Sequence, residues 1–170
     1  YVLDSTPIPF SITQENSSTD TGVTVVKVKA RDVAQKGVIE ITKTGEIFKS
    51  VIENEGIYTP IYENGNLANA VFEIYAAEDI TTLDGTVRAY QGELVDEITT
   101  GKNGIAKSKQ LYLGKYTVIE KTAPDTFVNA NEQYDVELTY AGQDVKVTST
   151  ALSVFNDRQK VSVSLSKIME

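Results

Sequence analysis

Cysteine and histidine are both absent from this sequence of 170 residues. Their absence excludes disulfide bonds, thiolate nucleophiles, zinc sites built from Cys and His, and every acid–base scheme that depends on an imidazole. Most catalytic mechanisms of ordinary hydrolases are therefore excluded. We therefore expect a protein that is not a turnover enzyme and that carries no cofactor and no metal.

Clusters of basic residues and long apolar runs are also missing. The net charge is −8 and the Lys and Arg residues are scattered, whereas a nucleic-acid backbone and an anionic membrane both attract clustered positive charge. No apolar run reaches the roughly 18 residues that a membrane span needs. Neither nucleic acid nor a membrane is an expected partner. The first residues show no signal-peptide pattern, so we interpret the sequence as a fragment excised from a longer protein.

Short segments in which apolar and polar residues alternate make up most of the chain. Turn signals separate these segments at intervals of roughly 8–12 residues, as in antiparallel sandwiches. No segment shows a sustained apolar period of about 3.6 residues, which is the mark of an amphipathic helix. The sequence therefore predicts an all-β fold, an antiparallel β-sandwich with little helix.

The expected strands follow from this alternation. Residues 1–36 are interpreted as two strands joined by a loop, the second of them at 23–30. Residues 37–45 form the next strand, followed by a hairpin of residues 47–53 and 56–63 and by a turn at 63–66. A polar connection with room for one helical turn covers 77–85. Further strands are expected at 70–76, 94–99, 105–107, 116–122, 133–139, 145–148 and 152–156.

Two parts of the sequence recur at a nearly constant distance. Residues 35–43 match residues 159–167, and residues 1–13 resemble residues 127–139. On the first register Asp32 corresponds to Asn156, and Lys167 corresponds to Lys43. Such a repeat divides the chain into three parts. We expect the terminal strands of a preceding repeat at 1–36, one complete domain at 37–160 and the first strand of a following repeat at 161–170.

Three polar side chains fall in phase with the apolar residues of three separate strands. They are Lys43, Glu120 and Asn156, and each follows apolar or aromatic residues two and four positions earlier. Residues two apart in a strand point the same way, so all three side chains are expected to face the core. A single Lys or Glu in such a position usually lies at a sheet edge. Three together indicate a shared buried site, because an unpaired buried charge costs several kcal/mol.

These three residue types form a reactive set. Burial in an apolar pocket favours the uncharged forms of an amine and of a carboxyl group, and an uncharged Lys43 amine is a nucleophile. Glu120 would hydrogen-bond the side-chain carbonyl of Asn156, polarise it, and relay protons from the amine to the departing ammonia. The expected product is an isopeptide bond between Lys43 and Asn156 that forms once in each chain. The partners of Asp32 and Lys167 would lie in neighbouring repeats.

The order of these motifs resembles a known family. After the strand with Lys43 come LANAVFEIYA (67–76), GIAKSKQLYLGKYTVIEKTAP (104–124) and VFND (154–157). Over residues 37–157 the chain resembles the Cna protein B-type (SpaA-like, prealbumin-like) domains of Gram-positive surface adhesins and pilins, most specifically in LxLGKYxVxExxAP. The resemblance implies an immunoglobulin-like or prealbumin-like sandwich. It also assigns the cross-link to Lys43 and Asn156 and its promotion to Glu120.

The resemblance carries expectations about biology as well. It implies export, sortase anchoring to the cell wall of a Gram-positive bacterium, and a tandem stalk in which neighbouring repeats are partners. The sequence departs from the family pattern in three places. Asn69 and Thr126 stand where Gly is common, and residues 47–63 form a longer stretch than many members carry.

Two other functions fit parts of the sequence. A module that binds a host matrix protein or a carbohydrate needs an exposed aromatic cluster, although tyrosines more often pack against sheets. The candidate tyrosines are Tyr58, Tyr62, Tyr75 and Tyr90. A carboxylate-based hydrolase is the weaker alternative, because adjacent residues of a strand face opposite ways. Its candidate pairs are Asp96 with Glu97 and Glu78 with Asp79.

Overall fold

A computed structural model describes residues 1–13, 25–129, 131–161, 164 and 166–168. This described part contains strands and no helix, so the all-β prediction is confirmed. It also contains no helix that is long and apolar enough to cross a membrane. The strands are β1 (Lys36–Asn54), β2 (Ile57–Asn66), β3 (Val71–Ala76), β4 (Ile80–Thr81), β5 (Val87–Ala89), β6 (Leu94–Thr99), β7 (Ile105–Lys107), β8 (Leu111–Tyr112), β9 (Gly114–Thr122), β10 (Gln133–Leu138) and β11 (Val147–Asn156).

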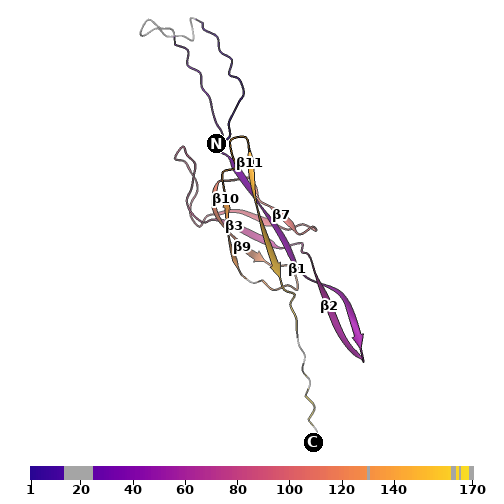
Figure 1. Cartoon of the computed structure of the whole chain (residues 1–170). Coiled ribbons are helices and arrows are strands. Elements are labelled where there is room, and N and C mark those ends of the chain that lie inside the picture. The colour runs from indigo at the N-terminus through magenta and orange to yellow at the C-terminus, as the bar shows by residue number, and fades with distance from the viewer. Residues whose placement is uncertain (14–24, 130, 162–163, 165, 169–170) are drawn as a thin grey trace.

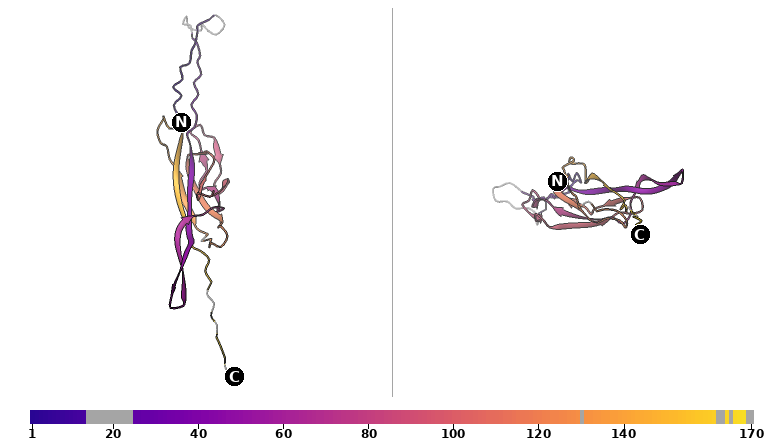
Figure 2. Two further views of the ribbon diagram at one scale, coloured as in Figure 1. Left: turned by 90° about the vertical axis from the view of Figure 1, so that its right-hand side faces the viewer. Right: turned by 90° about the horizontal axis from the view of Figure 1, so that it is seen from below.

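Two sheets form the body of the molecule. One has the order β11-β1-β2, with the short strands β7 and β8 also paired to β1, and the other has the order β10-β9-β3-β6. Strands β4 and β5 form a separate small ribbon. The molecule is elongated, with the N-terminal segment at one end and the tip of the β1–β2 hairpin and the C terminus at the other (Figures 1 and 2).

The first and last strands of the domain lie side by side in parallel. Lys36 of β1 pairs with Val147 of β11, and the register continues to Gly45 and Asn156. All other strand pairs of the described residues are antiparallel. The predicted β-sandwich is therefore confirmed, and it differs from a purely antiparallel one by the single parallel pair of β1 and β11 among the described strands. Parallel neighbours need a long connection, and here the whole domain provides it.

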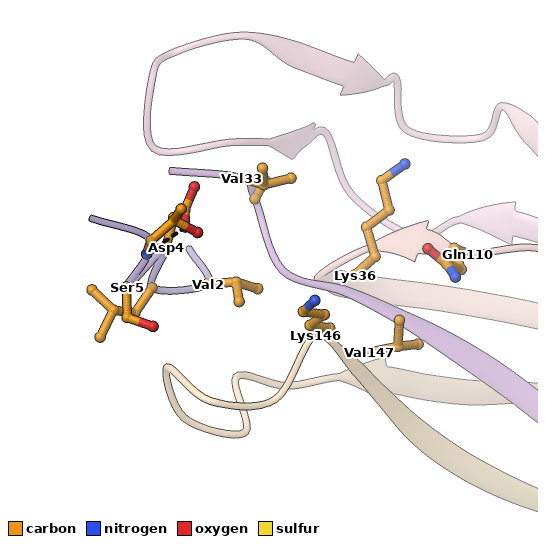
Figure 3. Close-up of a pocket in the computed structure, with 11 residues that line it drawn as sticks. Val2, Asp4, Ser5, Val33, Lys36, Gln110, Lys146 and Val147 are labelled. Atoms are coloured by element: carbon orange, nitrogen blue, oxygen red, sulfur yellow. Dashed lines mark hydrogen bonds between the residues drawn. The ribbon is translucent and has the colours of Figure 1, made fainter. Parts of the chain in front are cut away.

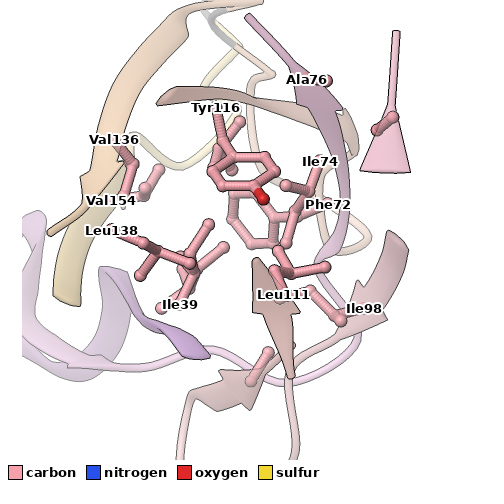
Figure 4. Packing of buried hydrophobic residues seen from close by; sticks show 14 of the residues in the cluster. Ile39, Phe72, Ile74, Ala76, Ile98, Leu111, Tyr116, Val136, Leu138 and Val154 are labelled. Atoms are coloured by element: carbon pink, nitrogen blue, oxygen red, sulfur yellow. The ribbon is translucent and has the colours of Figure 1, made fainter. Parts of the chain in front are cut away.

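The core lies between the two sheets and is built from alternate residues of each strand. Ile39 and Ile41 of β1, Phe72 and Ile74 of β3, and Val118 of β9 are completely buried. Figure 4 shows Tyr116 packed with Phe72 and Ile74 near Leu111. The Tyr116 hydroxyl donates to the backbone oxygen of Tyr112 at 2.6 Å, which satisfies its polar end inside the core.

Strand β1 is longer than the sequence indicated. The residues predicted as two strands, 37–45 and 47–53, form one continuous strand, and the turn predicted at 63–66 lies inside β2. Their pairing explains the difference, because Gly45 and Glu46 pair with Gly65 and Asn64 and extend the hairpin ladder. The predicted hairpin itself is confirmed. Glu55 (φ 50°) and Gly56 (φ 79°) have positive φ values, as in a type I′ turn.

The prediction for residues 1–36 is only partly testable. Residues 14–24 lie outside the described residues, and this range includes the start of the strand expected at 23–30. In the described residues before Lys36 there are isolated bridges, such as Val2 with Val33, and no strand. The two strands predicted there are wrong for the described part. The helical turn expected within 77–85 is also wrong, because β4 pairs with β5 instead.

Two departures from the family pattern occupy left-handed backbone positions. Asn69 has a φ of 65° and Thr126 a φ of 72°. Glycine adopts such values without strain, Asn tolerates them, and a β-branched residue rarely does. Thr126 is therefore a strained residue in the turn that follows β9.

Candidate cross-linking site

Lys43 lies on the core-facing side of β1. Its side chain is completely buried, because it continues the inward alternation of Ile39 and Ile41. The Lys43 backbone N–H donates to Gly104 O at 2.7 Å, and its carbonyl accepts from Leu67 N at 3.0 Å. These two bonds hold the strand at the point where the side chain enters the core.

Asn156 is the last residue of β11 and is also buried, at 2% exposure. In the parallel register it stands opposite Gly45, while Lys43 stands opposite Val154. A Cβ atom at Gly45 would lie 2.5 Å from Asn156 O and 2.6 Å from Leu67 Cδ1. Only glycine fits there. The missing side chain lets the end of β11 approach β1 beside the Lys43 side chain.

Glu120 reaches the same place from the other sheet. It lies on β9 opposite Phe72 of β3 and is 4% exposed. The Asn129 side-chain amide donates to the Glu120 backbone oxygen at 2.9 Å. The sandwich thus brings together all three residues that the sequence singled out, two from one sheet and one from the facing sheet.

The Glu120 carboxyl group contacts both nitrogens of the site. Asn156 Nδ2 donates to Glu120 Oε1 and Oε2, each at 3.0 Å, and Lys43 Nζ lies 3.5 Å from Oε1. Within the described residues, Lys43 Nζ and Asn156 Oδ1 are buried and make no hydrogen bond. The predicted bond from Glu120 to the Asn156 carbonyl is therefore wrong for this structure. The amide nitrogen faces Glu120 instead, because only the nitrogen can donate to two acceptor oxygens.

The surroundings favour an uncharged amine. Burial lowers the pKa of Lys43, and the neighbouring Glu120 opposes this shift only in part. The site continues the apolar core, since Ile41 precedes Lys43 and Val154 precedes Asn156 on the same strand faces. An amine in such a place loses its proton more readily than one in water. It is then a nucleophile beside an amide.

Two further residues of the site were not singled out from the sequence. Gly45 makes room for Asn156, and Asn129 holds the backbone of Glu120. An isolated glycine inside a strand pattern signals a close backbone approach, so Gly45 carried a readable signal. The sequence around Asn129 carries no comparable signal, because its hydrogen-bond partner is a backbone oxygen nine positions away.

The tyrosines considered for a binding module do not share one element. Tyr58 and Tyr62 lie on β2, Tyr75 on β3, and Tyr90 after β5. Tyr58 is 70% exposed and Tyr90 is 65% exposed. Tyr75 donates to Glu73 Oε2 at 2.7 Å. Tyr62 packs edge-on against Phe48, with ring centroids 6.3 Å apart.

The carboxylates considered for a hydrolase are engaged at exposed positions or, for Asp96, at a partly buried one. Asp96 Oδ2 accepts from Lys109 N at 2.7 Å, and Glu97 Oε2 accepts from Lys121 Nζ at 2.6 Å. Asp79 accepts from Gln91 N at 2.8 Å, and Glu78 from Lys115 N at 3.3 Å. Each holds a neighbouring segment in place. In the part of the chain that the structure describes, no group of three or more acidic side chains is placed to hold a metal ion.

Comparison with protein families matches this chain to one of them. The model of the SpaA prealbumin-like fold domain matches residues 59–152, more than half of the chain. The chain belongs to this family. The matched region of this SpaA domain includes Glu120, whereas Lys43 and Asn156 lie on either side of it. No curated protein sequence matches the chain.

Solved structures resemble the SpaA domain in fold. GBS52, the minor pilin of Streptococcus agalactiae, is 16% identical with a TM-score of 0.50, over 91% of this chain and 58% of that one. The full-length major pilin SpaD from Corynebacterium diphtheriae is 20% identical with a TM-score of 0.48, over 73% and 32%. The Bacillus anthracis TIE protein is 20% identical with a TM-score of 0.44, over 73% and 17%. The chain thus spans less than two thirds of each of these proteins.

Proposed function

We propose that this chain is a structural stalk module of a Gram-positive surface protein of the pilin type, exported and anchored to the cell wall. Residues 37–160 form the complete module, residues 1–36 end a preceding repeat, and residues 161–170 begin a following one. The neighbouring repeats are its partners. The SpaA family match and the pilin fold relatives support this role.

The module is locked by an isopeptide bond that it forms itself. The uncharged Lys43 amine attacks Cγ of Asn156, a C–N bond forms, and the C–Nδ2 bond breaks. Glu120 takes a proton from the attacking nitrogen and gives one to the leaving nitrogen, so that ammonia departs. The balance is one amine and one primary amide giving one secondary amide and one ammonia. Each Glu120 acts once, and there is no turnover.

The observation that carries this proposal is the position of Glu120. Its carboxyl oxygens lie within 3.5 Å of the attacking nitrogen and 3.0 Å of the leaving nitrogen. A proton can therefore pass from one to the other through a single group. Burial keeps out water that would otherwise compete for the protons, and fixed strands hold the amine beside the amide.

The parallel pairing of β1 and β11 makes the bond mechanically useful. Force enters at the start of β1 and leaves after the end of β11, at opposite ends of the domain. With the bond in place, force passes along Lys36 to Lys43, crosses to Asn156 and exits. The remainder of the domain, residues 44–155, is then outside the covalent load path, so pulling does not unzip its hydrogen-bonded strands.

Intact mass spectrometry of the purified chain tests the proposal. We expect a mass lower than that of the sequence by one ammonia, and a linked peptide pair containing Lys43 and Asn156 after digestion. Glu120→Gln and Lys43→Arg should each restore the full mass. A matched control, Glu137→Gln, changes an exposed carboxylate of β10 and should leave the mass deficit unchanged. A full mass for the folded wild-type chain would overturn the proposed chemistry and leave the fold unaffected.

A further inference from the structure

The β1–β2 hairpin extends beyond the sandwich as an exposed arm. Pairing of β1 with β11 ends at Gly45, while pairing with β2 continues to Asn54. Residues 46–63, which we call the hairpin arm, therefore form a two-stranded ribbon that projects from the body (Figures 1 and 2). A ribbon of two strands alone in water has marginal stability, and its edges are open to pairing.

Apolar side chains cover both faces of this arm. Five of them are between 49% and 70% exposed: Phe48, Val51, Ile52, Ile57 and Tyr58. Val51 pairs with Pro60 and Glu53 with Tyr58, whereas Asn54 pairs with Ile57. Cross-strand partners share a face, so Val51 and Tyr58 lie on one face and Ile57 lies on the other. Exposed apolar side chains gathered on one projecting ribbon favour contact with a partner.

A cavity of about 740 Å³ lies at the opposite end of the domain, where β1 and β11 begin. Its wall is apolar at Val2, Val33 and Val147, and two lysines stand at its edge, Lys36 and Lys146 (Figure 3). Asp4 is the single acidic residue that lines it. The arm tip carries the opposite charge, with Glu53 and Glu55 beside Ile57 and Tyr58. The two ends are thus complementary both in charge and in apolar surface.

We propose that the hairpin arm of one copy docks, tip first, into this cavity of a second copy of the chain. The contact is heterologous, because the arm and the cavity are different surfaces at opposite ends. Such contacts propagate into a linear array unless the geometry closes a ring. In a tandem protein the arm of each repeat points toward the repeat that follows, and the cavity lies at the junction of the two, because Val2 and Val33 belong to the segment that ends the preceding repeat. Covalent continuity then raises the effective concentration of the contact. This inference extends the proposed stalk function but does not depend on the isopeptide bond.

A disulfide trap tests the contact directly, because the chain has no cysteine of its own. One chain carries Asn54→Cys at the arm tip, and a second carries Gln110→Cys at the cavity. The control partner carries Ser153→Cys, which is exposed in the middle of β11. A disulfide forms only when the two Cα atoms come within about 7 Å. We expect the heterodimer of the tip and cavity variants to form several-fold faster than the heterodimer of the tip and control variants. The rates are measured by non-reducing gel electrophoresis and by intact mass.

Charge reversal distinguishes docking from random collision. Glu53→Lys in the arm chain, or Lys146→Glu in the cavity chain, should each slow trapping several-fold, and combining the two should restore it. High salt should slow trapping in the wild-type charge background. Equal trapping of the cavity and control cysteines, or no restoration in the combined reversal, would overturn the proposal. The mass test of the cross-link is independent of all these outcomes, so the two proposals fail separately.

Discussion

Lys43 and Asn156 lie on adjacent parallel strands and are offset by two register positions. Asn156 stands opposite Gly45, and Lys43 stands opposite Val154. The Lys43 side chain must therefore extend along its own strand to reach the amide, and the glycine at position 45 leaves room for the backbone of Asn156. Glu120 approaches from the facing sheet, within 3.5 Å of the amine. The offset and the glycine together create the arrangement that the proposed cross-link requires.

Gly45→Ala tests this relationship. The added Cβ would meet Asn156 O at 2.5 Å, so the end of β11 must move away from β1. We expect slower or incomplete cross-linking, measured as the fraction of chains that have lost ammonia at fixed times after refolding. Gly101→Ala is the matched control for substituting a glycine, since Gly101 has no positive φ and the closest atom to an added Cβ there is the end of a side chain, Asn103 Oδ1, at 3.2 Å. Full cross-linking of the Gly45→Ala chain at the wild-type rate would contradict this role.

Lys43→Met should lower stability through loss of the bond. The two residues of the proposed cross-link are 113 positions apart, and the loop-entropy model for a link of that span gives about 4–5 kcal/mol. Methionine fills the same apolar space, and Lys43→Met is combined with Glu120→Gln so that no buried carboxylate is left without its amine. The loss then reports mainly on the bond. Urea unfolding should show a lower midpoint and a free energy of unfolding that is lower by about this amount. Equal stability of the variant and a cross-linked wild type would contradict the entropic estimate.

The unreacted site should show a pH dependence of stability. In Asn156→Ala no bond can form, and burial keeps the pKa of Lys43 in the folded state below its ordinary value of 10.5. The unfolded chain then binds more protons than the folded chain at pH values between the two. The free energy of unfolding should therefore rise as the pH increases toward 10.5. The Lys43 contribution to the slope should be missing in the Lys43→Met/Asn156→Ala chain, which keeps the contributions of other groups such as Tyr116, whose pKa burial raises to about 12. Parallel curves for the two variants would refute the assignment.

Thr126→Gly should stabilise the domain. A left-handed backbone costs an L-residue roughly 1–2 kcal/mol, and the greater freedom of glycine when unfolded offsets roughly 0.5–1 kcal/mol. We expect a net gain of about 0.5–1 kcal/mol, seen by calorimetry as a rise in Tm of about 1–4 °C. Asp125→Gly, at a neighbouring residue without positive φ, should not raise Tm. A fall in Tm for Thr126→Gly would show that the threonine side chain stabilises the turn.

The length and pairing of β1 illustrate what alternation alone does not encode. The alternating pattern correctly predicted that residues 37–45 and 47–53 are in strands, but it did not predict that they form one strand. The two segments are joined by the ladder with β2, which depends on cross-strand partners. The predicted turn at 63–66 failed for the same reason. Asn and Gly favour turns locally, yet Asn64 and Gly65 are held in β2 by pairing with Glu46 and Gly45.

By itself, the sequence determined which side chains face the core. The two-residue period of a strand places Lys43, Glu120 and Asn156 in phase with apolar neighbours, and all three are buried. Only the tertiary structure decided that β1 and β11 are parallel neighbours, that Gly45 stands opposite Asn156, and that the amide nitrogen faces Glu120. The period of a strand specifies a face but not a partner. Partner and register come from packing between segments that are 36 positions apart for Glu120 and Asn156 and 111 apart for Gly45 and Asn156.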